Sequence, residues 1–134
     1  MPKPATIDTT PDYTPGQAPR TGLARVLRAF VHSWRGLRYA FRHEAAIRQE
    51  CAVLALGSVI AVCADLTPSE AALLLCSLLF LLVVELLNSA VEAVVDRVGK
   101  DYHPLSGAAK DMGSAAVLLC SLGVGLLWVV TLAG

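Results

Sequence analysis

The sequence is poor in charge, and it lacks the pattern that a soluble helical protein needs. Only 16 % of its 134 residues are Asp, Glu, Lys or Arg, and the formal net charge is zero. Residues 71–84 contain no charged side chain at all. A helix over that stretch has no water-facing stripe, so a soluble three-helix bundle is excluded. The length allows one domain at most.

Three sequence motifs are also missing. The four cysteines stand singly in apolar stretches with no C-x-x-C spacing, so neither a disulfide nor a cysteine metal site is expected. The first 22 residues lack an apolar core with a cleavage site, so no cleavable signal peptide is expected. No Walker-A motif is present, and Gly123-Val124-Gly125 is an incomplete GxGxxG inside an apolar run. Any nucleotide site must therefore be of another kind.

The sequence does have three long apolar stretches, at Ile47–Leu66, Ala71–Val95 and Met112–Gly134, and 55 % of its residues are hydrophobic. Each stretch approaches or exceeds the roughly 20 residues that a helix needs to cross a bilayer. We therefore predict an all-α integral membrane protein. The predicted spans lie at about 46–64, 70–97 and 106–133.

Two segments precede the first span. Residues 1–21 hold five of the seven prolines and almost no large apolar residues, so we expect a disordered arm. From residue 22 to about 45, apolar residues recur at three- and four-residue steps with arginines between them. This pattern predicts an amphipathic helix, and its place next to the first span favours the anionic membrane surface over a cytoplasmic helix packed on the protein itself. Residues 22–134 then form a single membrane domain.

The basic residues are unevenly distributed along the chain. Eight of the eleven Lys and Arg residues lie at or before the start of the first span, and the other three lie between the second and third apolar stretches. The connection Ala64–Glu70 has none, and the C-terminal end has none. The positive-inside rule therefore predicts a cytoplasmic N-terminus and a periplasmic C-terminus, as three crossings require.

A polar stripe interrupts the second span, and its members are Glu85, Asn88, Glu92 and Asp96. Spacings of three, four and four residues place them within about 80° of one helix face. An ionised carboxylate in the bilayer costs several kcal/mol unless it is paired, metal-bound or protonated. We therefore expect Glu85 and Glu92 to belong to a functional site. For Asp96, an ion pair with Arg97 or Arg48 is as good an interpretation as a functional role.

The residues around the stripe suit phosphoryl transfer to a membrane alcohol. A desolvated Glu can act as a general base near neutral pH. A second Glu, with a carboxylate from the N-terminal helix, can hold Mg²⁺, which prefers one or two carboxylates plus substrate phosphates. Lys110 and the N–H groups that begin the third helix suit phosphate. A proton or ion conductor is the alternative of another class. The uncharged outer half of the second span argues against it.

Residues 85–119 resemble the signature of the bacterial membrane-integral diacylglycerol kinase family, with the string ELLNSAVEAVVDRVGKDYHPLSGAAKDMGSAAVLL. Residues 33–50, SWRGLRYAFRHEAAIRQE, are similar to the surface helix of that family. The resemblance covers about residues 23–134. It implies homotrimers of three-span subunits in the bacterial inner membrane, which transfer the γ-phosphate of MgATP to diacylglycerol and produce phosphatidic acid. A related branch phosphorylates undecaprenol, but RQE at 48–50 and DMGSAA after Lys110 favour the diacylglycerol branch.

The resemblance also implies roles for single residues, by matching position. Glu85 would be the general base that takes the proton of the lipid hydroxyl, with Asn88 in support, and Glu44 and Glu92 would hold Mg²⁺. The predicted nucleotide contacts are Arg25, His32, Glu44, Glu92, Asp101, Tyr102, His103, Lys110 and Asp111. The predicted lipid contacts are Arg25, Ser33, Trp34, Glu50, Glu85 and Ser114. No nucleic-acid partner is expected.

Overall fold

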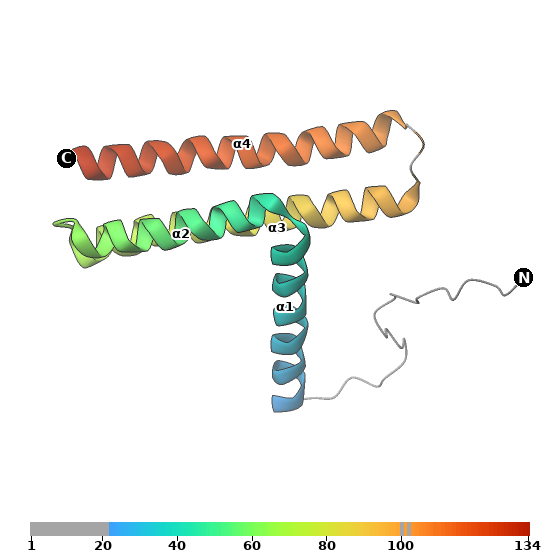
Figure 1. The fold of residues 1–134 in the computed structure, drawn as a ribbon, viewed down its shortest axis with the longest axis horizontal. Helices are drawn as coiled ribbons and strands as arrows, with labels where there is room; N and C mark the ends of the chain where they lie inside the picture. The colour runs from blue at the N-terminus through green and yellow to red at the C-terminus, as the bar shows by residue number, and fades with distance from the viewer. Residues whose placement is uncertain (1–21, 100, 102) are drawn as a thin grey trace, which may run out of the picture. The chain divides into compact units, whose positions relative to one another are not determined.

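The computed structural model describes residues 22–99, 101 and 103–134, and these form helices joined by short connections (Figure 1). The helices are, in order, α1 (Leu23–His43), α2 (Ala45–Cys63), α3 (Pro68–Val98) and α4 (Pro104–Ala133). The predicted all-α fold is therefore confirmed. The chain divides into two units, of which the second begins at Gly36. The predicted arm at 1–21 lies outside the described residues.

Among the described residues, three of the four helices are long and apolar enough to cross a membrane. They are α2 with 19 residues, α3 with 31 and α4 with 30. At about 1.5 Å per residue, α3 and α4 are longer than the roughly 30 Å of hydrocarbon that a span must cross. Part of each helix can therefore extend into the polar region beyond the bilayer core.

Helix α3 is the centre of the second unit, since it packs against both α2 and α4. Helix α4 runs back beside α3 in the opposite direction (Figure 1). The buried residues of α3 are Leu74, Leu78, Leu81 and Glu85, which follow one another at steps of four, three and four. They form one helix face. The core of the unit therefore ends, on α3, in a carboxylate.

Prolines begin α3 and α4 earlier than the sequence indicated, at Pro68 and Pro104 in place of residues 70 and 106. Both prolines occupy the first helical turn, where a missing N–H costs nothing. Each helix is also capped by the residue before it. The Thr67 side chain accepts a bond from the N–H of Glu70, and His103 Nδ1 accepts one from the N–H of Leu105.

The junction of α1 and α2 is held by Arg48. Its guanidinium Nη1 lies 3.2 Å from the carbonyl oxygen of Phe41 and 3.4 Å from that of Arg42, at the end of α1. These carbonyls have no partner within their own helix, so a cation from α2 satisfies them. Glu44, the residue between the two helices, has an extended backbone with φ −103° and ψ 121°. Arg48 thereby fixes the place of Glu44 at the junction.

A second contact joins the three spans at their other end. Trp128 Nε1 of α4 donates to Ser77 Oγ of α3 over 3.3 Å. Gly57 of α2 lies against the same place, where an added Cβ would be 2.6 Å from Leu78 Cδ1 and 2.9 Å from the Trp128 ring. The absence of a side chain at Gly57 therefore allows the three helices to approach closely.

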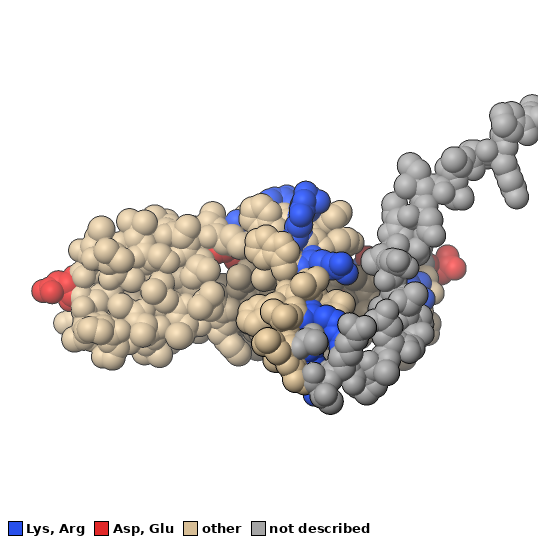
Figure 2. All heavy atoms as spheres, turned by 90° about the horizontal axis from the view of Figure 1, so that it is seen from below, with Lys and Arg blue, Asp and Glu red and all other residues tan. Residues whose placement is uncertain are grey.

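Charged side chains are sparse on the surface of the spans. Figure 2 shows an uncharged surface over much of their length, with acidic side chains visible toward both ends of the view. The connection between α2 and α3 holds Asp65, Glu70 follows in the first turn of α3, and neither segment has a Lys or Arg. Large apolar side chains such as Leu119 and Leu126 are 70 % and 67 % exposed on α4. An apolar exterior of this kind suits contact with lipid.

Candidate functional site

Glu85 is the charged side chain that the structure buries, with 7 % of its surface exposed; within the described residues no other Asp, Glu, Lys or Arg is buried. Its position follows from the pattern of α3, because it continues the apolar face of Leu74, Leu78 and Leu81. The structure thus places the predicted general base at the end of the core, where water has little access.

Three further carboxyl groups lie within electrostatic range of this core. Glu85 interacts with Glu44 at the α1–α2 junction and with Glu92 about two turns along α3. Glu50 of α2 interacts with Glu85, and its Oε2 atom is buried without a hydrogen-bond partner among the described residues. Carboxylates that are close together repel one another when all are ionised. The region is therefore suited to hold a cation, a proton, or both.

Asn88 links two of the predicted site residues. Its Nδ2 donates a hydrogen bond to Glu92 Oε1 over 3.1 Å, within one turn of α3. Its Oδ1 atom is buried and has no partner among the described residues. An amide with one bonded end can orient a carboxylate, and the buried oxygen end of Asn88 is held by packing and not by a bond.

The two predicted metal ligands open onto one cavity of about 540 Å³. Its lining consists of Gly36, Tyr39, Ala40, Glu44, Leu86, Ser89, Ala90, Glu92, Ala93 and Asp96. Within the described part of the chain, no three His, Cys, Asp or Glu residues stand close enough to hold a metal by themselves. Two hard carboxylates completed by phosphate oxygens are nevertheless the arrangement that Mg²⁺ prefers. The residues therefore fit a Mg²⁺ ion that arrives with a nucleotide.

A neighbouring cavity of about 430 Å³ gathers predicted nucleotide contacts from the α3–α4 connection. Its lining consists of Val95, Asp96, Gly99, Asp101, His103, Ser106, Gly107 and Lys110. His103 uses Nδ1 as an acceptor from the N–H of Leu105, which leaves Nε2 as the ring donor. Tyr102, also predicted to contact the nucleotide, lies outside the described residues.

Asp96 lines both cavities. Its side chain forms an ion pair that the sequence did not predict. Lys110 Nζ of α4 lies 2.5 Å from Asp96 Oδ1. The partners expected from the sequence, Arg97 and Arg48, are wrong, because Arg48 is bonded to the end of α1 and Lys110 takes the carboxylate. Only the register of α4 against α3 brings the ammonium to this position.

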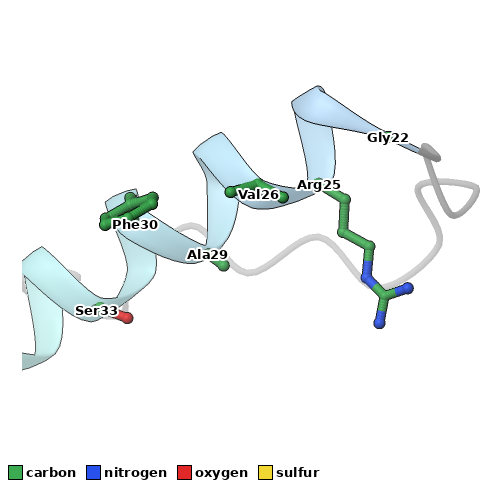
Figure 3. Close-up of a pocket in the computed structure, with 6 residues that line it drawn as sticks. All are labelled: Gly22, Arg25, Val26, Ala29, Phe30 and Ser33. Atoms are coloured by element: carbon green, nitrogen blue, oxygen red, sulfur yellow. The ribbon is translucent and has the colours of Figure 1, made fainter.

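Arg25 and Ser33 line one cavity of about 540 Å³ on α1, within the first unit (Figure 3). With Ala29 they stand on successive turns of the helix, while Val26 and Phe30 lie beside them (Figure 3). A guanidinium beside apolar side chains suits a ligand that has both an anionic and an apolar part.

Five other predicted site residues line none of these cavities. His32 and Trp34 are exposed on α1, Asp111 and Ser114 are exposed on α4, and Glu50 is half-buried on α2. Sequence reasoning also missed one residue at the site. An added Cβ at Gly113 of α4 would overlap the Asn88 Oδ1 atom. The run AKDMGSAA contains this glycine, but only the packing of two helices shows what it faces.

Comparison with known proteins relates the chain to one protein family. Residues 31–132 match the family model for prokaryotic diacylglycerol kinase. The chain is similar to the diacylglycerol kinase of Escherichia coli (strain K12), with 48 % identity over 112 residues that cover 84 % of this chain and 92 % of the relative. The diacylglycerol kinase of Pseudomonas aeruginosa is 44 % identical over 115 residues, with 86 % and 94 % coverage. That of Haemophilus influenzae is 42 % identical over 108 residues, with 81 % and 92 % coverage. Every site residue predicted from the sequence, except Arg25, lies within the matched range.

Proposed function

The chain belongs to the prokaryotic diacylglycerol kinase family, and from this premise we propose that it transfers the γ-phosphate of MgATP to the hydroxyl group of diacylglycerol. Its activity is that of an ATP-dependent lipid kinase of lipid metabolism. The ion conductor, which the intramembrane carboxylates alone left open, is set aside by this family membership.

The observation that carries the proposed mechanism is the contrast between two carboxylates on α3. Glu85 is buried at the end of the apolar core, whereas Glu92 opens onto a cavity. Seven residues separate them, which is about 10 Å along a helix at 1.5 Å per residue. One helix can therefore present a dry base to a lipid hydroxyl and a hydrated carboxylate to a water-soluble donor.

In the proposed reaction, Glu85 accepts the proton of the lipid hydroxyl. The hydroxyl oxygen forms a bond to the γ-phosphorus, and the bond from that phosphorus to the bridging oxygen breaks, with its electron pair leaving on ADP. Glu85 then releases the proton to water, and phosphatidic acid is the lipid product. A positioned general base contributes about 10²- to 10⁴-fold to such a step. The remaining acceleration would come from positioning and charge stabilisation, which dominate phosphoryl transfer.

Glu44 and Glu92 are the proposed ligands of Mg²⁺. Both side chains line one cavity, and both are close enough to Glu85 for their charges to interact with it. Asn88 donates a hydrogen bond that orients Glu92. When bound with ATP, Mg²⁺ would neutralise charge on the phosphates. The role of Asn88 is then to hold the Glu92 carboxylate in one orientation, as partners of metal ligands do.

The proposed nucleotide site is the cavity of Asp101, His103 and Lys110. Lys110 supplies an ammonium for a phosphate, and it is already held at the cavity by Asp96. His103 is fixed by its bond to the N–H of Leu105. The further proposed nucleotide contacts are Arg25, His32, Tyr102 and Asp111.

The proposed lipid site includes Glu85. Glu50 contributes a buried carboxyl oxygen without a partner, close enough to Glu85 for their charges to interact. Arg25 and Ser33 share a cavity on α1, where a guanidinium and a hydroxyl could donate hydrogen bonds to the oxygen atoms of a glycerol lipid while apolar side chains contact its chains. Trp34 and Ser114 complete the proposed set.

The proposed orientation has the N-terminus and the α3–α4 connection in the cytoplasm. Basic residues at these places, and their absence from the α2–α3 connection, support it. ATP then reaches the site from the compartment that contains it. We also propose a single membrane domain at 22–134 that assembles as a homotrimer. The absence of buried residues on α4 in one subunit is consistent with further helices packing on it.

The substrate is tested by the transfer of labelled γ-phosphate from ATP into extractable lipid. Purified protein in detergent is given diacylglycerol or undecaprenol in separate reactions. Label in phosphatidic acid with little in undecaprenyl phosphate supports the proposal. Preferred labelling of undecaprenol would move the chain to the other branch, and no label in any lipid would contradict the kinase activity.

A further inference from the structure

Gly113 of α4 faces the side chain of Asn88 on α3, at the place where these two helices run side by side (Figure 1). An ideal Cβ at Gly113 would overlap Asn88 Oδ1 and would lie 3.2 Å from Asn88 Cγ. The backbone of α4 therefore occupies the space directly beside the amide. Any side chain at this position must displace Asn88.

The orientation of the Asn88 amide determines that of Glu92. The nitrogen end of the amide donates to Glu92 Oε1, and the oxygen end is the part that contacts Gly113. That oxygen has no hydrogen-bond partner among the described residues, so no bond competes with the contact in setting its place. A shift of the oxygen end rotates the whole planar amide, and the bond to Glu92 is then lost or bent.

We propose that Gly113 is a positioning residue for the metal site: its missing Cβ lets the Asn88 amide lie against α4 and hold the Glu92 carboxylate toward the cavity it shares with Glu44. The inference rests on the proposed role of Glu92 as a Mg²⁺ ligand. It adds a residue of α4 to a site whose proposed metal ligands come from the α1–α2 junction and α3. A purely structural role for Gly113, in which it only allows close helix packing, predicts different results.

The test is the Mg²⁺ dependence of ATP binding to purified protein in detergent without lipid substrate, so that no turnover occurs. Gly113→Ala is expected to raise the Mg²⁺ concentration at half-maximal ATP binding roughly 10-fold, as loss of a partner to a metal ligand does. Gly123→Ala is the matched control, because it adds the same methyl group to α4 at a place with nothing within 4 Å. It should leave the Mg²⁺ midpoint unchanged. A shifted unfolding temperature with an unchanged Mg²⁺ midpoint in Gly113→Ala would overturn the proposal.

A second measurement asks whether Gly113 acts through Asn88. In an Asn88→Ala background the amide is absent, so Gly113→Ala should add little to the shift that Asn88→Ala already causes. An equal added shift in both backgrounds would contradict the proposal. If Gly113→Ala alone does not fold, the same contact is tested in a double variant that combines Gly113→Ala with Asn88→Ser, because the serine side chain is shorter and leaves room for the added methyl group. Recovery of folded protein supports the contact, and failure to recover contradicts it.

The variant Glu92→Gln separates a wrong metal-ligand assignment from a wrong role for Gly113. If Glu92→Gln leaves the Mg²⁺ midpoint unchanged, then Glu92 is not a metal ligand and the premise fails, whatever Gly113→Ala does. If Glu92→Gln raises the midpoint and Gly113→Ala does not, the premise stands and the role of Gly113 is wrong.

Discussion

Lys110 of α4 and Asp96 of α3 form an ion pair across the two helices, with Nζ and Oδ1 2.5 Å apart. The side chains are 38 % and 64 % exposed, so the pair adds only about 0 to 1 kcal/mol to stability. The ion pair matters chiefly because it sets the position of the Lys110 side chain. The pair keeps the ammonium at the mouth of the cavity that Asp101 and His103 also line.

Lys110→Met and Asp96→Asn should therefore weaken ATP binding to different extents. Lys110→Met removes a charged contact to phosphate and should raise the KM for ATP roughly 10- to 100-fold, which corresponds to about 1.5–3 kcal/mol. Asp96→Asn keeps the ammonium but removes the carboxylate that positions it, so the KM for ATP should rise by less than in Lys110→Met. Steady-state kinetics with saturating lipid measure both values. An unchanged KM in Asp96→Asn would show that the ion pair does not position Lys110 for ATP.

Glu92→Gln and Glu44→Gln should each raise the Mg²⁺ requirement of turnover. Both variants keep the side-chain shape and remove one charge from a proposed ligand, and we expect an increase on the order of 10-fold or more. The measurement is the initial rate against Mg²⁺ concentration at fixed ATP. Glu70→Gln is the matched control, since it changes the same residue type on α3 in a capping box that tolerates Gln. If the control shifts the Mg²⁺ midpoint as much, the two carboxylates have no special role.

Gly57→Ala should destabilise the helix bundle without altering the chemistry. The added methyl would meet Leu78 Cδ1 at 2.6 Å and the Trp128 ring at 2.9 Å, and overpacking of this kind costs about 1–3 kcal/mol. The measurement is the unfolding midpoint in detergent. Gly123→Ala, with open space at its Cβ, should be close to neutral. Wild-type stability in Gly57→Ala would mean that the three helices do not approach as closely at this point.

Much of the fold follows from the sequence because its signals are local. A span is recognised from the length and hydropathy of one segment, and the three predicted spans correspond to α2, α3 and α4. The burial of Glu85 was also foreseeable, because it continues the helical spacing of Leu74, Leu78 and Leu81. Helix starts are less well predicted, since the expected spans begin at about 70 and 106 and leave out Pro68 and Pro104, although proline is favourable in a first helical turn.

The contacts between helices could not be predicted in the same way. The pairing of Asp96 with Lys110 depends on the register of α4 against α3, which no spacing within one helix specifies. The same holds for Gly113 beside Asn88 and for Gly57 beside Trp128. A glycine in an apolar run predicts close packing, but it does not identify the neighbour. The proposed site therefore combines residues found by local pattern with positions set by tertiary packing.

The most direct test of the proposed mechanism compares turnover with nucleotide binding in Glu85→Gln. The variant keeps the size and polarity of the side chain but cannot accept a proton from the lipid hydroxyl. We expect the rate of phosphate transfer to diacylglycerol to fall by about 10²- to 10⁴-fold. MgATP binding, measured in the same preparation, should remain within a few fold of wild type. Wild-type turnover in Glu85→Gln would contradict the assignment of Glu85 as the base, and with it the central claim that α3 presents a buried base to the lipid.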